Sequence, residues 1–122
     1  MVGKTLEGVR VVDMTRVLAG PYCTMILREL GAEVIKIETP DGGDDARQFG
    51  PFLDDEQTKS AYFISINTGK QSMTLDLKHE SGRRVLADLI QKSDVLVENF
   101  RPATLEKLGF SDAEIKKINP LL

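Results

Sequence analysis

Two short apolar segments on either side of one helix-forming segment constrain the fold of this chain more than any other feature. The first segment, Val9–Asp13, is β-branched and bounded by glycine and polar residues, as is typical of a buried parallel strand. Pro21 fits the first position of a helix, and Gly31 fits the left-handed position just past its end. Glu33–Glu38 is then a second strand. The order strand, helix, strand predicts a right-handed βαβ unit and an α/β fold.

The helix between Pro21 and Gly31 carries apolar residues at helical spacing. Cys23, Ile26, Leu27 and Leu30 form one stripe that we expect to face the sheet. Cys23 is the only cysteine, so an intrachain disulfide is impossible. Its place on the stripe favours a core thiol over a nucleophile.

After Glu38 the spacing of apolar residues is irregular up to about residue 71 and periodic from there on. Between Thr39 and Gln71 the periodicity fades, and only Ala61–Asn67 could form a short element. Such a long irregular segment in a compact domain is usually functional or mobile. Downstream, the pattern predicts a strand at 72–78, a helix at 80–93, a strand at 94–100, a one-turn helix at 104–109, a helix at 112–118 capped by Ser111 and Glu114, and the start of a strand at 119–122.

Composition excludes several classes of partner. The 122 residues suit one domain, and the net charge of -3 comes from 16 basic and 19 acidic residues that are interspersed. Neither nucleic acid nor an anionic membrane is therefore an expected partner. The start has no apolar signal region, and no apolar run approaches the roughly 18 residues of a membrane span. We expect a cytoplasmic protein, with an organelle matrix such as that of mitochondria as the alternative.

Two loops have the placement of ligand-binding loops in a parallel sheet, where ligands lie beyond the carboxyl ends of the strands. The first, Thr15–Pro21, leads from the first strand into the helix. Gly20 would let a ligand approach the backbone, and Arg16 is a donor suited to phosphate or carboxylate. The alternative is that Ala-Gly-Pro simply starts a helix.

The second loop, Glu98–Lys107, follows the fourth strand. Asn99 could bond an amide or a purine edge, Phe100 offers a stacking face, and Arg101 and Lys107 are cations near a helix start. A solvated loop with incidental charges is the alternative.

Other chemical signals are weaker. His79 is the only histidine, so a metal site or a Ser-His pair is not expected. Asp41, Asp44 and Asp45 could coordinate a cation, but their spacing does not fit an EF-hand, and an exposed turn is the default. The G-x-G-x-x-G signature is absent after the first strand, although Glu38 occupies the position that holds a ribose in dinucleotide-binding proteins.

Several blocks in order resemble one family across essentially the whole chain. They are "LEGVRVVDMTRVLAGPYCTMILRELGAEVIKIE", "GDDAR", "SMTLDLK", "DVLVENFRP", "LEKLGF" and "INP". Together they resemble the N-terminal part of the family III CoA-transferases, the CaiB/BaiF group that includes formyl-CoA transferase. The resemblance implies a Rossmann-like, doubly wound, mainly parallel sheet with helices on both faces. Residues 1–122 would be the N-terminal part of the large domain of an interlocked homodimer.

The resemblance also implies a substrate and the residues that contact it. Coenzyme A would pass from an acyl-CoA to a small carboxylic acid, with no permanently bound cofactor and no metal. The implied CoA-contacting residues are Arg16, Val17, Leu18, Ala19, Leu75, Lys78, Asn99, Phe100, Arg101, Lys107 and Leu108. Thr39, Thr68, Gln71 and Ala103 depart from residues common in the family. We therefore expect the phosphates of CoA to depend more on Lys70, Lys78, Arg101 and Lys107.

In the family, the nucleophile is an aspartate downstream of the segment present here, so no catalytic residue is expected within 1–122. That carboxylate attacks the acyl-CoA thioester to give a mixed anhydride, and the released CoA thiolate converts the anhydride to an aspartyl-CoA thioester. The related α-methylacyl-CoA racemases are one alternative. They tend to have Pro-Gly-Pro at Ala19–Pro21 and Glu-Pro-Phe at Glu98–Phe100, so both loops favour transfer. A non-catalytic nucleotide-binding module is the other alternative.

Overall fold

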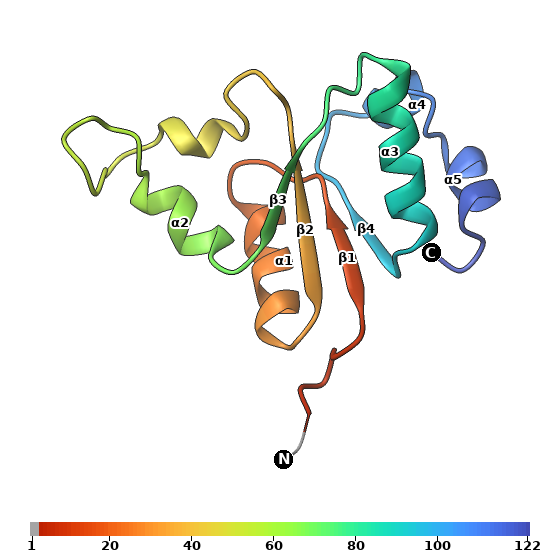
Figure 1. The fold of residues 1–122 in the computed structure, drawn as a ribbon, viewed down its shortest axis with the longest axis horizontal. Helices are drawn as coiled ribbons and strands as arrows, with labels where there is room; N and C mark the ends of the chain where they lie inside the picture. The colour runs from red at the N-terminus through yellow and green to blue at the C-terminus, as the bar shows by residue number, and fades with distance from the viewer. Residues whose placement is uncertain (1–2) are drawn as a thin grey trace.

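The computed structural model describes residues 3–122 and has a single parallel sheet between layers of helices (Figure 1). Its elements are β1 (Arg10–Asp13), α1 (Ala19–Glu29), β2 (Glu33–Glu38), the 3-10 helix η1 (Asp45–Gln48), α2 (Ala61–Asn67), β3 (Gln71–Thr74), α3 (Glu80–Gln91), β4 (Val95–Val97), α4 (Thr104–Lys107) and α5 (Asp112–Ile118). Within residues 3–122, no helix combines the length and the apolar character needed to cross a bilayer.

The strands lie in the order β3-β2-β1-β4, and every neighbouring pair is parallel. β1 pairs with β2 and β4, so the two most buried strands, β1 and β2, are central, and α1 connects β1 to β2 as the sequence predicted. Since all four strands run the same way, their carboxyl ends meet at one edge, the upper edge in Figure 1. The predicted doubly wound α/β fold is confirmed.

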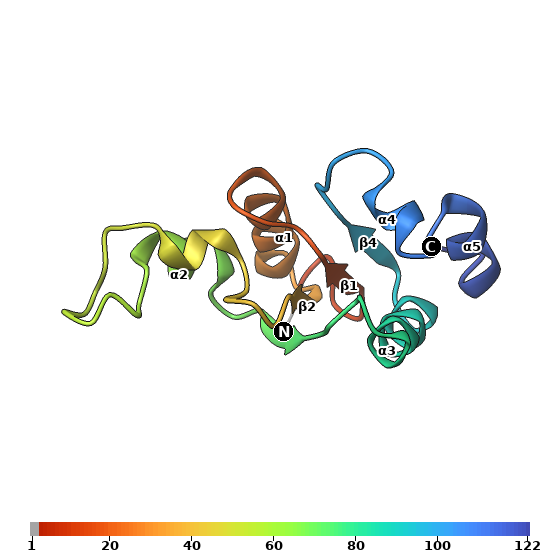
Figure 2. The same cartoon turned by 90° about the horizontal axis from the view of Figure 1, so that it is seen from above.

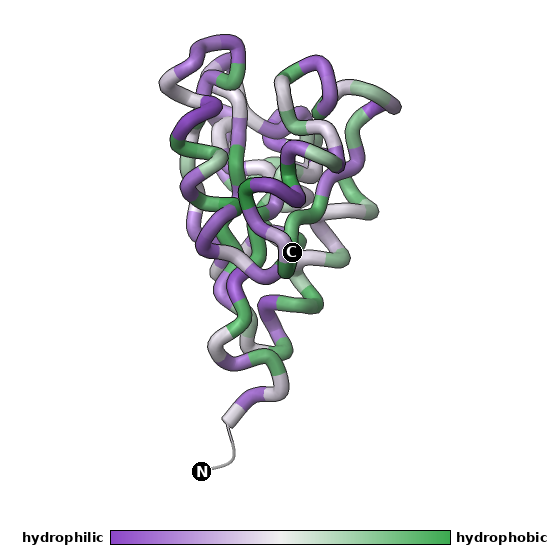
Figure 3. The backbone as a smooth tube through the Cα atoms, turned by 90° about the vertical axis from the view of Figure 1, so that its right-hand side faces the viewer, coloured by the Kyte–Doolittle hydropathy of each residue, from purple (hydrophilic) through white to green (hydrophobic). Residues whose placement is uncertain are grey.

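Alternation along the strands divides the core into two layers. Toward α3, Val12, Ile35 and Ile37 pack with Leu86 and Ile90 in the main core cluster. Toward α1, a smaller cluster is formed by Val11, Ala32 and Val34, with Leu27 packed against it. Figure 2 shows α1 and α3 on opposite sides of the sheet, and Figure 3 shows hydrophilic and hydrophobic residues alternating along the helices, as expected for helices with one covered face.

The predicted inward stripe of α1 is wrong. Cys23 is exposed, and Ile26 and Leu30 keep 43% and 45% of their surface accessible. Leu27 alone of that stripe packs against a core cluster. Helical spacing identified an apolar face correctly, but it could not show which face of α1 lies on the sheet.

Small residues turn α1 toward the sheet instead. Gly20, Pro21 and Thr24 are buried, and the helix begins at Ala19, two residues before Pro21. A Cβ on Gly20 would lie 2.3 Å from the Cβ of Thr15. Any side chain at position 20 would collide with Thr15, so only glycine allows α1 to approach β1 this closely. This close approach decides which face of α1 is buried.

The segment between β2 and β3 contains more structure than its sequence indicated. η1 follows Asp44, and α2 occupies the one stretch for which an element was expected. The Ser60 hydroxyl caps α2 by accepting from the Phe63 amide at 3.1 Å. β3 is shorter than predicted because Asp76 starts a turn, in which its carboxylate accepts from the Lys78 amide at 3.0 Å.

The C-terminal elements follow the predicted order. α3, β4, α4 and α5 are present, and Ser111 caps α5 by accepting from the Glu114 amide at 3.2 Å. Residues 119–122 form a turn rather than the start of a strand. The Asn119 side chain donates to the carbonyls of Ile90 and Ser93 at 2.9 and 2.8 Å, and Leu122 packs against the main core cluster, which fixes this turn beneath α3.

Glu38, at the end of β2, connects three parts of the chain. Its carboxylate accepts from the Arg47 guanidinium at 2.7 and 2.8 Å, from the Asp44 amide at 2.9 Å and from the Ser72 hydroxyl at 3.0 Å. Burial raises the Glu38 pKa, but these donors outweigh it and lower the pKa to about 2. Both oxygens are thus used within the protein, and the ribose-binding position suggested by the sequence is occupied by an internal ion pair.

The acid sensitivity of the fold tests this network. Because the folded pKa of Glu38 is lowered from 4.5, its contribution to stability is full above about pH 4.5 and is lost as the pH falls toward 2. At neutral pH, Glu38→Gln should reduce the free energy of unfolding by about 2 to 3 kcal/mol, and the difference from the unsubstituted protein should shrink by about pH 3. Urea unfolding measured across this range checks it.

Glu33→Gln on the same strand is the matched control, because Glu33 pairs with Arg10 in a half-exposed position. That substitution should cost less than about 1 kcal/mol. An equal and pH-independent loss for Glu38→Gln would show that the network does not depend on the charge of Glu38.

Candidate functional site

The candidate site lies at the carboxyl edge of the sheet, where the loops after β1, β2, β3 and β4 converge. The sequence had singled out the loops after β1 and β4. These two loops contact each other directly, as expected for strands that pair side by side.

Asn99, after β4, holds the main chain of Arg16. Its Oδ1 accepts from the Arg16 amide and its Nδ2 donates to the Arg16 carbonyl, both at 2.9 Å. This pair of bonds is the one that an asparagine could make to a purine edge or a ligand amide. The side chain is thus used to join the two loops, and a direct contact between Asn99 and CoA stays a prediction.

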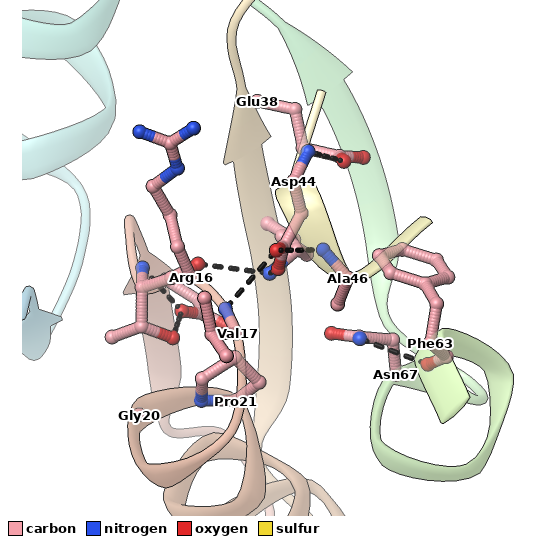
Figure 4. A network of polar contacts seen from close by, with 12 residues as sticks. Arg16, Val17, Gly20, Pro21, Glu38, Asp44, Ala46, Phe63 and Asn67 are labelled. Atoms are coloured by element: carbon pink, nitrogen blue, oxygen red, sulfur yellow. Dashed lines mark hydrogen bonds and ion pairs between the residues drawn. The ribbon is translucent and has the colours of Figure 1, made fainter. Parts of the chain in front are cut away.

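Asp44, after β2, holds the next residue of the same loop. Its Oδ1 accepts from the amides of Val17 at 3.0 Å and Ala46 at 2.9 Å, and its Oδ2 accepts from Lys36 Nζ at 2.9 Å (Figure 4). Burial raises the Asp44 pKa, but the Ala46 amide, Lys36 and the Val17 amide together hold it below its usual range. Lys36 also donates to the Thr15 carbonyl at 2.9 Å.

A second buried ion pair lies below this loop. Lys70 Nζ is 3.0 Å from Asp13 Oδ2 and also donates to the Pro21 carbonyl and to Asn67 Oδ1, each at 2.9 Å. The Thr24 hydroxyl donates to the same Asp13 oxygen at 2.6 Å. Burial lowers the pKa of the Lys70 ammonium, and the Asp13 carboxylate offsets part of that effect. The expectation that Lys70 contacts phosphate is wrong, because its ammonium is buried and fully engaged.

A small pocket opens between these loops. Its volume is about 30 Å³, and its apolar walls include Met14, Ile37, Leu75, Leu77 and Phe100. Arg16 lines the same pocket, so the structure brings together three residues predicted from separate blocks of sequence: Arg16, Leu75 and Phe100. The Arg16 guanidinium is 3.1 Å from Asp45 in a half-exposed pair, which leaves it able to turn toward an anion.

An open groove of about 580 Å³ continues from Phe100 along the loop after β4 toward α5. Arg101, Leu105 and Ser111 line it. Ala103, one of the positions expected to depart from the family, adopts a left-handed conformation with φ of 65°. A glycine would adopt this conformation freely because it lacks a Cβ.

The remaining predicted contact residues lie around these two hollows. Val17, Leu18 and Ala19 are exposed at the start of α1, and Lys78 is exposed in the turn before α3. Lys107 is the exposed last residue of α4, whereas Leu108 packs against the main core cluster. Each of these positions stays a predicted CoA contact.

No group of three or more His, Cys, Asp or Glu side chains suited to a metal ion occurs within residues 3–122. His79 precedes α3 and its Nε2 lies 3.4 Å from Asp76 Oδ2. Asp44 is buried in its ion pair, so the acidic stretch after β2 positions a loop and is more than the exposed turn that the sequence suggested.

Sequence reasoning did not identify Lys36 and Asp13 as members of the site. The available signal was a charged residue between Ile35 and Ile37 in the middle of a predicted strand. Since a buried charge is very costly without a partner, Lys36 within "EVIKIE" implies an acid nearby. Its partner Asp44 is eight residues away, in a segment without periodicity.

Comparison with known proteins gives a consistent result. The chain is 48% identical over 116 residues to an acetyl-CoA:oxalate CoA-transferase of Acetobacter aceti, covering 95% of this chain and 29% of the relative. It is 48% identical to a succinyl-CoA:glutarate CoA-transferase of Mus musculus, with 96% and 26% covered. A formyl-CoA:oxalate CoA-transferase of Bradyrhizobium sp. is 49% identical, with 96% and 27% covered. The chain thus spans less than a third of the length of these relatives.

Solved structures agree with the sequences. A CAIB/BAIF family protein from Brucella suis superposes with a TM-score of 0.88 at 42% identity, over 97% of this chain and 32% of that one. The protein Rv3272 from Mycobacterium tuberculosis, in its orthorhombic form, gives 0.90 at 42% identity, over 98% and 33%. The family model for CoA-transferase family III matches residues 6–122. This chain belongs to CoA-transferase family III.

Proposed function

We propose that this chain is the CoA-binding part of an acyl-CoA:carboxylate CoA-transferase. The observation that carries the proposal is the convergence of the loops after β1 and β4 at the carboxyl edge of the sheet. They are joined there by Asn99, beside a pocket lined by Arg16, Leu75 and Phe100. Among parallel sheets this edge is where nucleotide ligands bind.

The chemistry of the loops suits a nucleotide that carries phosphates. Lys78 and Arg101 are exposed cations, and Arg16 is a half-exposed one, of the kind that bind phosphate groups. Phe100 supplies an aromatic ring and, with Leu75, an apolar wall against which a base could pack. The start of α1 adds a helix N-terminus, which favours anions.

In this proposal the residues of the chain bind and orient the thioester, and bond making depends on an aspartate beyond residue 122. That carboxylate would attack the acyl-CoA carbonyl to give a mixed anhydride and release CoA thiolate. The thiolate would then attack the aspartyl carbonyl of the anhydride, which releases the donor acid and leaves CoA on the aspartate as a thioester for the acceptor acid. Carboxylate nucleophiles of this kind divide one difficult transfer into easier steps. Cytoplasmic location and an interlocked homodimer belong to the same proposal.

The names of the relatives support a substrate class. The three relatives described above are named for acetyl-CoA, succinyl-CoA or formyl-CoA as one substrate and for oxalate or glutarate as the other. We therefore propose a short acyl-CoA as the donor and a small dicarboxylic acid as the acceptor.

Removing one exposed cation should weaken binding. Arg101→Ala and Lys78→Ala should each weaken acyl-CoA binding by about 1 to 3 kcal/mol, the range for a hydrogen bond to a charged group. Isothermal titration at low salt measures this. Arg10→Ala is the control, because Arg10 lies at the opposite edge of the sheet in a half-exposed pair with Glu33. Unchanged affinity in both test variants would place the nucleotide elsewhere.

The racemase alternative is tested by isotope exchange. The full-length protein, incubated in deuterium oxide with a 2-methylacyl-CoA, should not exchange the proton at C2, and it should pass CoA to oxalate or glutarate. The residues Ala19 and Asn99 motivate this prediction, since racemases tend to have proline at both positions. Rapid deuterium uptake at C2 without any transfer of CoA would establish the racemase instead.

Residues 1–122 expressed alone should show no CoA transfer and low stability. The apolar side chains Leu18, Tyr22, Ile26 and Leu30 are exposed on α1, which favours loss of the folded state or association. The assay uses succinyl, oxalyl and formyl pairs, with hydroxylamine trapping and mass spectrometry to detect a thioester adduct. Turnover, or an adduct on Asp13, Asp44 or Asp76, would show that the nucleophile lies within these residues.

A further inference from the structure

The loop after β1 contains an unusual backbone conformation. Val17 has φ of 70°, in the left-handed region that glycine adopts freely and that a β-branched residue rarely adopts. Such outliers persist only where their surroundings enforce them, and they cluster at ligand-binding sites. Val17 lies directly between Arg16, which lines the pocket, and the start of α1.

The sequence next to Val17 does not supply the restraint. Leu18 is in the N-cap position of α1 and makes no side-chain capping bond. The acceptor for the Val17 amide is Asp44, 27 residues further along the chain. Figure 4 shows the Asp44 side chain between the Val17 amide and the Ala46 amide. The other carboxylate oxygen of Asp44 accepts from Lys36 Nζ at 2.9 Å.

The ion pair between Lys36 and Asp44, which restrains Val17, is rigid because both of its side chains are buried. The side chains of Lys36 and Asp44 keep only 2% and 1% of their surface exposed. Lys36 binds the Thr15 carbonyl and Asn99 binds both main-chain groups of Arg16, so three consecutive residues are held from other strand ends. The loop is thus fixed in one conformation before any ligand arrives.

We propose that Asp44 is a positioning residue for CoA binding. By accepting from the Val17 amide it holds Val17 in the left-handed conformation, and this aims Arg16 and the first turn of α1 at the ligand. The inference rests on the proposed function, since it concerns the same site. A preformed loop raises affinity because the ordering cost is not met at the moment of binding.

The decisive experiment compares two uncharged side chains at position 44, of which only one can accept a hydrogen bond from the Val17 amide. In a Lys36→Met background, Asp44→Asn keeps a carbonyl oxygen for the Val17 amide, whereas Asp44→Ala removes it. Neutral replacement of a buried ion pair is often tolerated, whereas removing one partner leaves an unpaired buried charge. The Ala form should bind CoA about tenfold more weakly than the Asn form, as expected for the loss of one hydrogen bond within the site.

Two further arms identify the route through Val17. Hydrogen exchange at the Val17 amide should be slow in the Asn form and fast in the Ala form. Adding Val17→Gly should shrink the difference in CoA affinity between the Asn and Ala forms to about twofold, because glycine adopts the left-handed conformation unaided. Such non-additive effects are expected when two positions are energetically coupled. Asp54→Ala is the matched control, since Asp54 also accepts from two backbone amides, those of Thr58 and Lys59, in an exposed loop.

A variant that keeps the charge guards against failure of the Ala form to fold. Asp44→Glu retains a carboxylate beside Lys36 but moves it by one methylene, so CoA binding should weaken although the pair persists. Equal CoA affinity in the Asn and Ala forms, or unchanged affinity in Asp44→Glu, would overturn the inference and leave the proposed function intact. A tenfold loss that Val17→Gly does not reduce would also overturn it. If the unsubstituted protein does not bind CoA, both proposals fail.

Discussion

The arrangement of the candidate site depends on the ion pair between Lys36 and Asp44. Lys36 is an inward-facing charge in a central strand, and burying it without a partner would be very costly. Asp44 supplies the partner at 2.9 Å, and in doing so it fixes the start of η1 and the loop after β1. Breaking such a pair by removing one member is far more damaging than replacing both.

The two faces of the sheet consequently have different properties. Toward α3 the strands are apolar to their ends, and the main core cluster forms there. Toward α1, Val11 and Val34 are apolar, but the next inward positions are Asp13, Lys36 and Glu38. Each of these charges is paired, with Lys70, Asp44 and Arg47 respectively. The sheet therefore ends in a network of fixed charges directly below the loops that we propose to bind CoA.

Much of the fold could be predicted because it depends on local signals. Pro21 lies in the first turn of a helix and Gly31 lies just past its end, and the flanking β-branched segments are strands, so the βαβ unit follows from chain order. The inward face of α1 could not be predicted in this way. It depends on the contact between Gly20 and Thr15, which outweighs the apolar stripe of Ile26 and Leu30.

The candidate site was predictable to the level of loops but not of contacts. Placement after predicted strands identified the loops after β1 and β4, family resemblance added CoA and the contact residues, and the structure brings Arg16, Leu75 and Phe100 to one pocket. The burial of Lys70 and the use of Asn99 within the protein depend on partners 57 and 83 residues away in the chain. Periodicity and spacing carry no information on such pairs, because the residues meet only after the sheet has formed.

The most direct test of the proposed site is a crystal structure of the full-length protein with CoA bound. We expect the nucleotide at the carboxyl edge of the sheet, with phosphate oxygens within hydrogen-bonding distance of Arg16 or Arg101 and the base against Phe100. We also expect Val17 to keep its left-handed conformation and its bond to Asp44. A nucleotide bound away from the loops after β1 and β4, for example on the exposed face of α1, would show that these loops are not the CoA site.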